Sequence, residues 1–250
     1  MLTIPRRFRG PARSGNGGYT AGSLAAFLHE PGDGPQPRPV VEVTLRRPPP
    51  LDVPLTVQVA DGTTAVVLLD DDGPVAEARV VDRELTVADE VDPDLAAAAS
   101  SDYAGFRKHP FPGCFACGTD REEGDGLRIF PGPIAADVVA AVWVPDSSLA
   151  VSSDLIDQGM QRVDLGVTWA ALDCAGGWSH DLEGRPSVLG RITARVDALP
   201  VVGERHVVVG RLTGTEGRKT FTAATLYDSD SRVVATAEHA WLQVDPAAFN

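Results

Sequence analysis

The 250-residue sequence has little positive charge, little cysteine and no long apolar run. Its 22 lysine and arginine residues stand against 35 aspartate and glutamate residues, which gives a formal net charge of −13. A surface this acidic repels phosphate backbones and anionic lipids, so we expect no nucleic-acid partner. Since no run approaches the ~18 apolar residues of a membrane-spanning helix, we also expect no membrane insertion.

The shortage of sorting signals and of cysteines predicts a cytoplasmic protein. The basic residues Arg6, Arg7 and Arg9 are not followed by the apolar segment that a secretory signal requires. Three cysteines, an odd number, then indicate reduced thiols rather than a disulfide framework.

Cys114 and Cys117 form a single Cys-x-x-Cys pair, with His109 five residues before it and Cys174 far along the chain. Structural zinc usually takes four ligands from two such pairs, and a redox pair usually opens a helix in a βαβ unit, which is absent here. We therefore interpret these cysteines as buried or turn thiols and predict no metal. Metal binding and redox chemistry are the alternatives.

Hydrophobic residues make up 43% of the chain and charged residues 23%, which is enough for an ordinary globular core. Two helices are predicted, at 14–30, where a glycine-rich turn leads in and Pro31-Gly32 stops the helix, and at 163–178, ending at Gly176-Gly177. β-branched runs bounded by turns such as Asp61-Gly62 and Asp72-Gly73 predict strands. The predicted strands are residues 40–46, 55–60, 64–69, 75–81, 137–144, 187–196, 205–213, 220–227 and 233–244.

The order of one helix followed by four strands occurs twice, which predicts an internal duplication. Residues 68–73 match residues 226–231, and each match follows a helix rich in small residues. Strands grouped after one helix indicate α+β units, each with a helix laid across an antiparallel sheet. We place the first unit at residues 1–100 and the second at 101–250, with a connector at about 83–113.

Three short segments resemble the hotdog fold of acyl-CoA thioesterases and dehydratases. They are Asn16-Gly17-Gly18-Tyr19, Ala170-Ala171-Leu172-Asp173, and Cys114-Phe115-Ala116-Cys117-Gly118 before Gly126-Leu127-Arg128. The resemblance spans nearly the whole sequence. It implies a double hotdog, in which two long helices are each wrapped by an antiparallel sheet and the two units pair side by side.

The resemblance also implies a carboxylate on the helix, nine residues after the first residue of the entry motif. In the first unit this position is Ala25, counted from Asn16, so the acid is missing. In the second unit the acid Asp173 is present, but its entry begins with Asp164 and lacks the two consecutive glycines. The losses are complementary, so we expect one composite site between the units.

In that site the resemblance gives Asp173 the role of general base or nucleophile. The N–H groups at Asn16, Gly17 and Gly18 would stabilise the oxyanion of a thioester, because a helix start offers free donors. Asn16 is equally suited to be the N-cap of the helix.

Two strand residues complete the expected site. Thr193 would supply the hydroxyl that holds the attacking water, and His239 stands near the position of an amide in the family. This departure leaves histidine as a base, or a site that binds without hydrolysis.

We therefore expect a hydrolase acting on an acyl-CoA or acyl-carrier thioester. We expect no cofactor, because coenzyme A would enter only as part of the substrate, and no single arginine can be assigned to its phosphates. The alternatives are a hotdog hydratase or dehydratase and a non-catalytic acyl-ligand-binding protein. One chain already supplies a pair of units, so a monomer and a homodimer of such pairs both fit.

Overall fold

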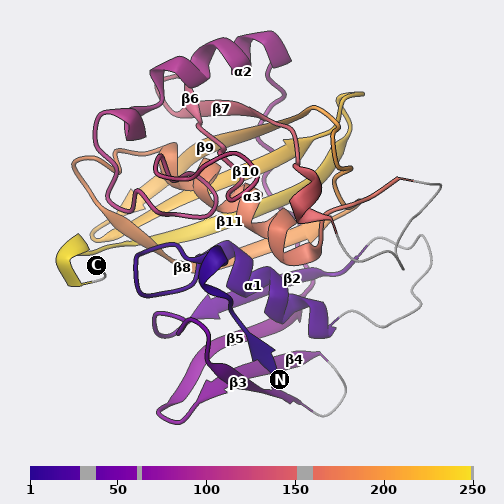
Figure 1. Cartoon of the computed structure of the whole chain (residues 1–250), viewed down its shortest axis with the longest axis vertical. Coiled ribbons are helices and arrows are strands. Elements are labelled where there is room, and N and C mark those ends of the chain that lie inside the picture. Colours follow the sequence, from indigo (N-terminus) through magenta and orange to yellow (C-terminus); the bar gives the residue numbers. More distant parts are fainter. Residues whose placement is uncertain (29–37, 61–63, 151–159, 249–250) are drawn as a thin grey trace.

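The computed structural model describes residues 1–28, 38–60, 64–150 and 160–248 (Figure 1). The predicted helix stop at residues 31–32 and the predicted turn at residues 61–62 lie outside the described residues.

Each half of the chain contains one long helix and a run of strands. The first unit consists of β1 (Leu2–Thr3), α1 (Gly17–Ala25), β2 (Val40–Leu45), β3 (Pro54–Val59), β4 (Ala65–Asp70) and β5 (Gly73–Val81). The second consists of β6 (Gly132–Ala135), β7 (Val138–Trp143), α3 (Leu165–Trp178), β8 (Ser187–Val196), β9 (His206–Glu216), β10 (Lys219–Tyr227) and β11 (Val233–Gln243). The connecting segment, residues 82–131, carries α2 (Pro93–Ala99). Short 3-10 turns occupy Arg6–Phe8, Ala26–Leu28, Ser100–Asp102, Ala104–Phe106, Ser147–Leu149 and Pro246–Ala248.

The strands form one continuous antiparallel sheet in the order β1-β3-β4-β5-β2-β8-β11-β10-β9-β7-β6. The units meet where β2 pairs antiparallel with β8, with Val43 opposite Ile192. From this seam the order is β2, β5, β4, β3 in one direction and β8, β11, β10, β9 in the other. The four strands counted outward from the seam therefore correspond between the units, and the predicted α+β double arrangement is observed.

Both long helices start at a capping residue that makes the same hydrogen bond, to the N–H three residues further on. The Asn16 side-chain oxygen accepts the Tyr19 N–H at 2.8 Å, and that of Asp164 accepts the Val167 N–H at 2.7 Å. Such caps satisfy N–H groups that a helix start leaves unpaired. The caps therefore set the same starting point for both helices, nine residues before Ala25 and before Asp173.

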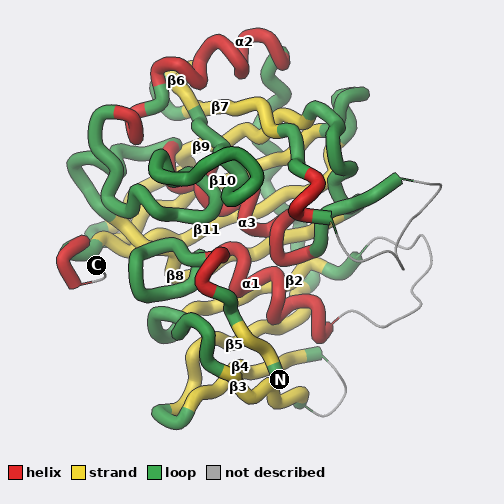
Figure 2. Tube along the Cα trace, in the orientation of Figure 1, coloured by secondary structure: helices red, strands yellow, loops and turns green. Residues whose placement is uncertain are grey.

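The two helices lie side by side on one face of the sheet (Figure 2). Glycine makes this contact possible, because a Cβ at Gly18 would lie 2.6 Å from Asp173 Cβ and one at Gly22 would lie 2.7 Å from Trp169 Cβ. The helix α3 also lies close to β9, where a Cβ at Gly210 would lie 1.9 Å from the Ala175 carbonyl oxygen.

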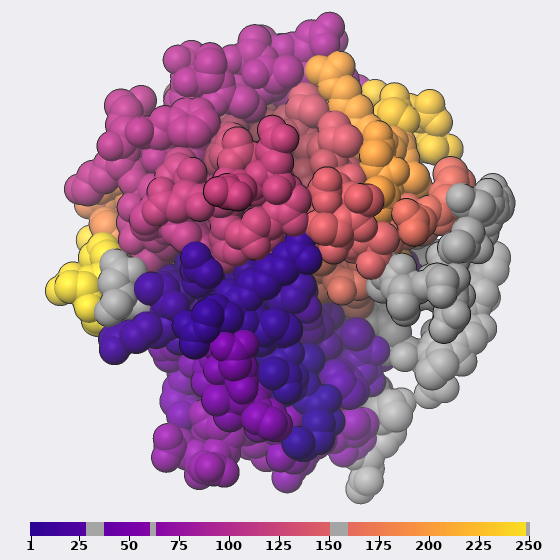
Figure 3. Space-filling view, viewed as in Figure 1, coloured from indigo at the N-terminus to yellow at the C-terminus, as the bar shows by residue number. Residues whose placement is uncertain are grey.

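The connecting segment covers parts of both faces of the sheet. The helix α2 contacts β6 and β7 on the face away from α3, where Ala96 packs with Val207 and Val209. Residues 93–99, which the predicted boundary assigns to the first unit, thus pack against strands of the second. Further along, the connecting segment lies beside the N-terminal residues over the long helices (Figure 3), where the Phe115 N–H donates to the Arg9 carbonyl at 2.7 Å. Within the described ranges, no helix is both long and apolar enough to span a bilayer.

Candidate active site

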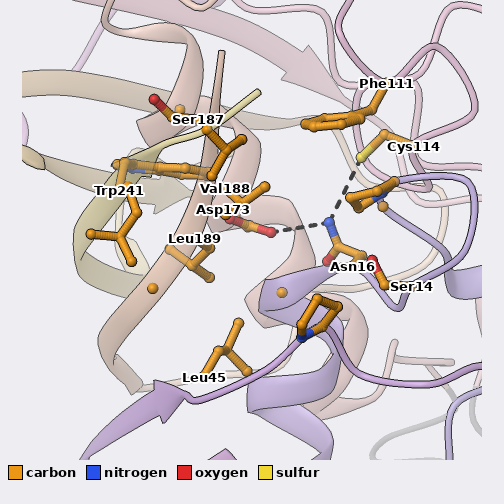
Figure 4. Close-up of a pocket in the computed structure, with 18 of the residues that line it drawn as sticks. Ser14, Asn16, Leu45, Phe111, Cys114, Asp173, Ser187, Val188, Leu189 and Trp241 are labelled. Carbon is orange, nitrogen blue, oxygen red and sulfur yellow. Dashed lines mark hydrogen bonds between the residues drawn. The ribbon is translucent and has the colours of Figure 1, made fainter. Parts of the chain in front are cut away.

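The Asp173 carboxyl group lies where α3 crosses the first turn of α1, and both donors that hold it come from the other unit. Its Oδ2 accepts the Gly18 backbone N–H at 2.9 Å and the Asn16 Nδ2–H at 3.0 Å. The side chains of Asn16 and Asp173 point toward one another (Figure 4). The structure therefore brings together Asp173, Asn16, Gly17 and Gly18, as the sequence predicted.

Some backbone N–H groups at the start of α1 donate a hydrogen bond within the protein, and one does not. The Gly18 N–H donates to Asp173, and the Tyr19 N–H donates to the Asn16 side chain. The Gly17 N–H, at the cavity wall, has no hydrogen-bond acceptor among the described residues. Gly17 is therefore the donor left to bind a ligand oxygen at this helix start.

The pKa of Asp173 is raised from 3.8 to about 7. Burial is the largest cause, because the residue is only 2% exposed and the charged form loses its hydration. The Gly18 N–H opposes the shift, the Cys114 thiol group adds to it, and the Asn16 side chain opposes it. The second oxygen, Oδ1, is buried and has no partner in the described part of the chain.

A cavity of about 240 Å³ opens beside this carboxyl group. Its walls come from the first unit, from the connecting segment and from the second unit, so the site is composite. Apolar side chains make up much of the wall: Leu45, Phe111, Val188, Leu189 and Trp241. Arg46, Arg47 and Arg218 also line it and supply positive charge.

Thr193 is not brought to this cavity. It pairs with Glu238 on β11 and Glu42 on β2, so it shares their face of the sheet. The neighbouring Ile192 pairs with His239 on the face that meets α3. Thr193 is therefore on the opposite face from Asp173 and cannot hold a water against it, which corrects the expectation from sequence.

His239 lies on the helix face of the sheet but outside the cavity wall. Its Nδ1 is 3.1 Å from the Thr222 hydroxyl, and the ring packs against Gly176. Burial lowers its pKa to about 4, so the imidazole is neutral at pH 7 and a weak base. Trp241, two residues further along β11, lines the cavity in its place. The structure therefore does not support the expected catalytic position of His239.

The equivalent position in the other unit carries no acid. Ala25 occupies the place of Asp173, and Asp164 occupies that of Asn16 as the cap of α3. Of the two equivalent positions nine residues after the helix caps, only that of Asp173 therefore carries a carboxylate.

Two features of the site were not anticipated from the sequence. The three cysteines are buried, as one of the two predictions for them stated, but the 3.7 Å separation of Cys174 Sγ from Cys114 Sγ was not foreseen. Arg218, in the tight turn between β9 and β10, lies at the cavity although nothing in its local sequence distinguishes it from other arginines.

No protein-family model matches this sequence, and no curated protein matches it. Among solved structures, the chain is similar to the tesB protein of Mycobacterium avium subspecies paratuberculosis, with 14% identity, a TM-score of 0.59 and coverage of 98% of this chain and 91% of that one. It is also similar to a conserved protein of unknown function with a hot dog fold from Alicyclobacillus acidocaldarius, with 15% identity, a TM-score of 0.52 and coverage of 96% and 90%. Since both likenesses span nearly the whole chain, the predicted double hotdog fold is confirmed.

Proposed function

We propose that this protein hydrolyses an acyl thioester at the composite site between its two units. The observation that carries the proposal is the placement of the Asp173 carboxyl group, held by Gly18 and Asn16 of the other unit beside an apolar cavity. A carboxylate can activate water as a general base, and a helix start can stabilise the oxyanion that forms when water attacks a thioester.

In the proposed reaction Asp173 acts as a general base. Its unpartnered Oδ1 takes a proton from water while the water oxygen bonds to the thioester carbonyl carbon. The Gly17 N–H donates to the oxyanion that forms. The C–S bond then breaks, the proton returns from Asp173 to the departing sulfur, and the products are a carboxylic acid and a thiol.

The cavity supports a substrate with an apolar acyl chain and an anionic carrier. The apolar wall suits an acyl group. Arg46 and Arg47 are paired with Glu77 and Asp70, whereas the Arg218 side chain donates to a backbone carbonyl and forms no ion pair among the described residues. We assign Arg218 to the phosphates of coenzyme A, and with it propose an acyl-CoA rather than a small thioester as substrate.

The test is a panel of acyl-CoA substrates assayed for release of free thiol. We expect Asp173→Asn to lower kcat by about 10²- to 10⁴-fold, the usual contribution of a general base. Asp164→Asn is the matched control, because it makes the same substitution at a helix cap that asparagine also fills, and we expect it to keep wild-type turnover.

A second comparison identifies the carrier. Arg218→Ala should raise KM for acyl-CoA and leave unchanged the hydrolysis of the same acyl group on N-acetylcysteamine, which has no phosphate. Equal turnover by wild type and Asp173→Asn would remove Asp173 from the mechanism. Binding of acyl-CoA without thiol release would favour the non-catalytic acyl-ligand-binding protein instead.

A further inference from the structure

All three cysteines of the chain gather at one point beside the cavity. The Sγ atoms of Cys114, Cys117 and Cys174, the cysteine cluster, lie within 4.8 Å of one another. The first two come from the connecting segment and the third from α3, 60 positions after Cys114. Each residue is less than a tenth exposed, and all three line the cavity.

The spacing of the sulfur atoms fits a shared metal ion. Two thiolates at the Zn–S distance of about 2.3 Å and at a tetrahedral angle lie about 3.8 Å apart. Cys114 Sγ and Cys174 Sγ are 3.7 Å apart. This pair thus has the separation that a tetrahedral ion sets, and the third sulfur atom lies within 4.8 Å of both.

The Cys-x-x-Cys loop is shaped to present both of its sulfurs to the same point. The Gly118 N–H donates to the Cys114 carbonyl at 2.9 Å, and the sulfur atoms of Cys114 and Cys117 lie within 4.8 Å of one another. A Cβ at Gly118 would lie 2.4 Å from the Cys114 carbonyl oxygen, so this turn admits only glycine. Cys-x2-Cys is also the usual ligand spacing of structural zinc sites.

Two side chains beside the cysteine cluster have N–H groups that can donate hydrogen bonds to its sulfur atoms. His109 Nδ1 accepts the Phe111 N–H at 2.9 Å, so in the neutral ring the proton is on Nε2. This Nε2 lies 3.4 Å from Cys117 Sγ and donates to it. The Asn16 Nδ2, 3.7 Å from Cys114 Sγ, is a second donor. Hydrogen bonds of this kind around metal-bound sulfur orient the ligands.

We propose that Cys114, Cys117 and Cys174 bind a zinc ion whose fourth coordination position opens into the cavity. Three thiolates select a soft or borderline ion over magnesium or calcium. Binding releases the three thiol protons to solvent, and three thiolates with one divalent cation leave a net charge of −1. His109 acts as a hydrogen-bond donor to the thiolate, and water from the cavity completes the tetrahedron. The ion would tie the connecting segment to α3 directly after Asp173.

The experiment measures metal in the full-length protein, purified without chelator and after incubation with Zn²⁺ and gel filtration. We expect about one zinc per chain by mass spectrometry of the metal, and its loss in Cys117→Ser. Replacement by Co²⁺ should produce a sulfur-to-cobalt charge-transfer band in the near ultraviolet. X-ray absorption should show three sulfur neighbours at about 2.3 Å and one lighter atom at about 2.0 Å.

Asp173→Asn is the matched control, because it changes the neighbouring residue and keeps all three thiols. It should retain zinc while losing thioester hydrolysis, so failure of the hydrolysis proposal and failure of the metal proposal are distinguishable. If Cys117→Ser does not fold, the cobalt spectrum and the X-ray absorption of the wild type decide. Wild type that takes up less than a tenth of an equivalent of zinc overturns the proposal. So does a Cys114–Cys174 disulfide that leaves a single titratable thiol on unfolding.

Discussion

Among the single residues of the site, Asp173 is subject to two opposing effects on its pKa. Burial destabilises its charged form, while the two donors at Oδ2 stabilise it, and the outcome is a pKa of about 7. A carboxyl group that titrates near neutral pH is suited to exchange protons with substrate there.

Asn16 should influence the pH dependence of kcat/KM. Hydrolysis should rise with pH through about 7, because only the ionised Asp173 accepts a proton. The Asn16 donor favours the charged form, so Asn16→Ser and Asn16→Ala should both move the midpoint to higher pH. Only Asn16→Ala should also lose the helix cap, at about 1 kcal/mol of stability. An unchanged midpoint in both variants would show that this hydrogen bond does not tune the base.

Asp173 should also make the stability of the protein depend on pH. The pKa of Asp173 is about 7 in the folded protein, whereas an aspartate in the unfolded chain has the ordinary value of 3.8. The unfolded chain therefore releases this proton at lower pH than the folded protein does. The ionised carboxyl group therefore lowers the free energy of unfolding progressively between pH 4 and 7. Asp173→Asn removes that effect.

Urea unfolding of wild type and Asp173→Asn at pH 5 and pH 8 measures the difference. The stability of the variant relative to wild type should increase by on the order of 2 kcal/mol between the two pH values. The exposed Asp120→Asn, which removes one formal charge at the surface, is the control and should show no such increase. A parallel pH dependence for Asp173→Asn and wild type would contradict the assignment of the raised pKa.

At the scale of elements, the contact between α1 and α3 depends on glycine. Gly18 and Gly22 lie one turn apart on α1 and face Asp173 and Trp169. Close approach of the helices is what brings the Gly18 N–H to the carboxyl group. The packing of the two helices and the geometry of the site therefore have the same cause.

We predict that Gly22→Ala lowers stability by about 1–3 kcal/mol, because the added methyl would overlap Trp169 and the Leu165 carbonyl. Denaturant unfolding measures this, and the rate of thioester hydrolysis should fall with it as the helices separate. Gly214→Ala on β9 is the matched control, since its Cβ would meet no atom within 4 Å. Equal midpoints for the two variants would show that the helices tolerate a wider separation.

The sequence predicted which residues form helices and strands better than it predicted which face of the sheet a strand residue occupies. Hydrophobic alternation and turn residues located both long helices and nine of the strands to within a few residues, because these signals are local. The face that Thr193 occupies depends on one extra residue in β8. The register shifts so that Ala240 pairs with Arg191 and Trp241 with Leu189, which leaves Gly190 as a bulge. Such a bulge moves every later side chain of the strand to the other face.

Long-range contacts account for the rest of what the sequence did not reveal. The spacing of nine residues placed Asp173 opposite a glycine-rich entry, because both helices start from equivalent caps. No local pattern shows that Cys174 meets the Cys114–Cys117 loop, since only the packing of the connecting segment on α3 brings them together. The same holds for α2, a short helix whose partners are strands far along the chain.

At the scale of the whole molecule, the duplication explains why one site exists. The units share a strand order that starts at the β2–β8 seam, so either helix could in principle carry an acid opposite the other helix start. Only α3 has kept the acid, and only α1 has kept the two glycines. Neither unit contains both groups, so the hydrolysis that we propose requires the two units to pair along the seam.

This dependence predicts the behaviour of a divided chain. A fragment ending at Asp82 and a fragment starting at Arg83 separate the units while leaving Thr86 and Ala88 with their β11 and β10 partners. Alone, each fragment should lack thioester hydrolysis, because the first lacks Asp173 and the second lacks Gly17 and Gly18. Co-expressed, they should purify together and hydrolyse acyl-CoA, since the β2–β8 ladder and the α1–α3 contact re-form.

The control is full-length protein that is cut after folding at a protease site inserted between Asp82 and Arg83, and it should remain active. Turnover by the second fragment alone, abolished by Asp173→Asn, would mean that the helix start of the first unit is dispensable and that the site is not composite.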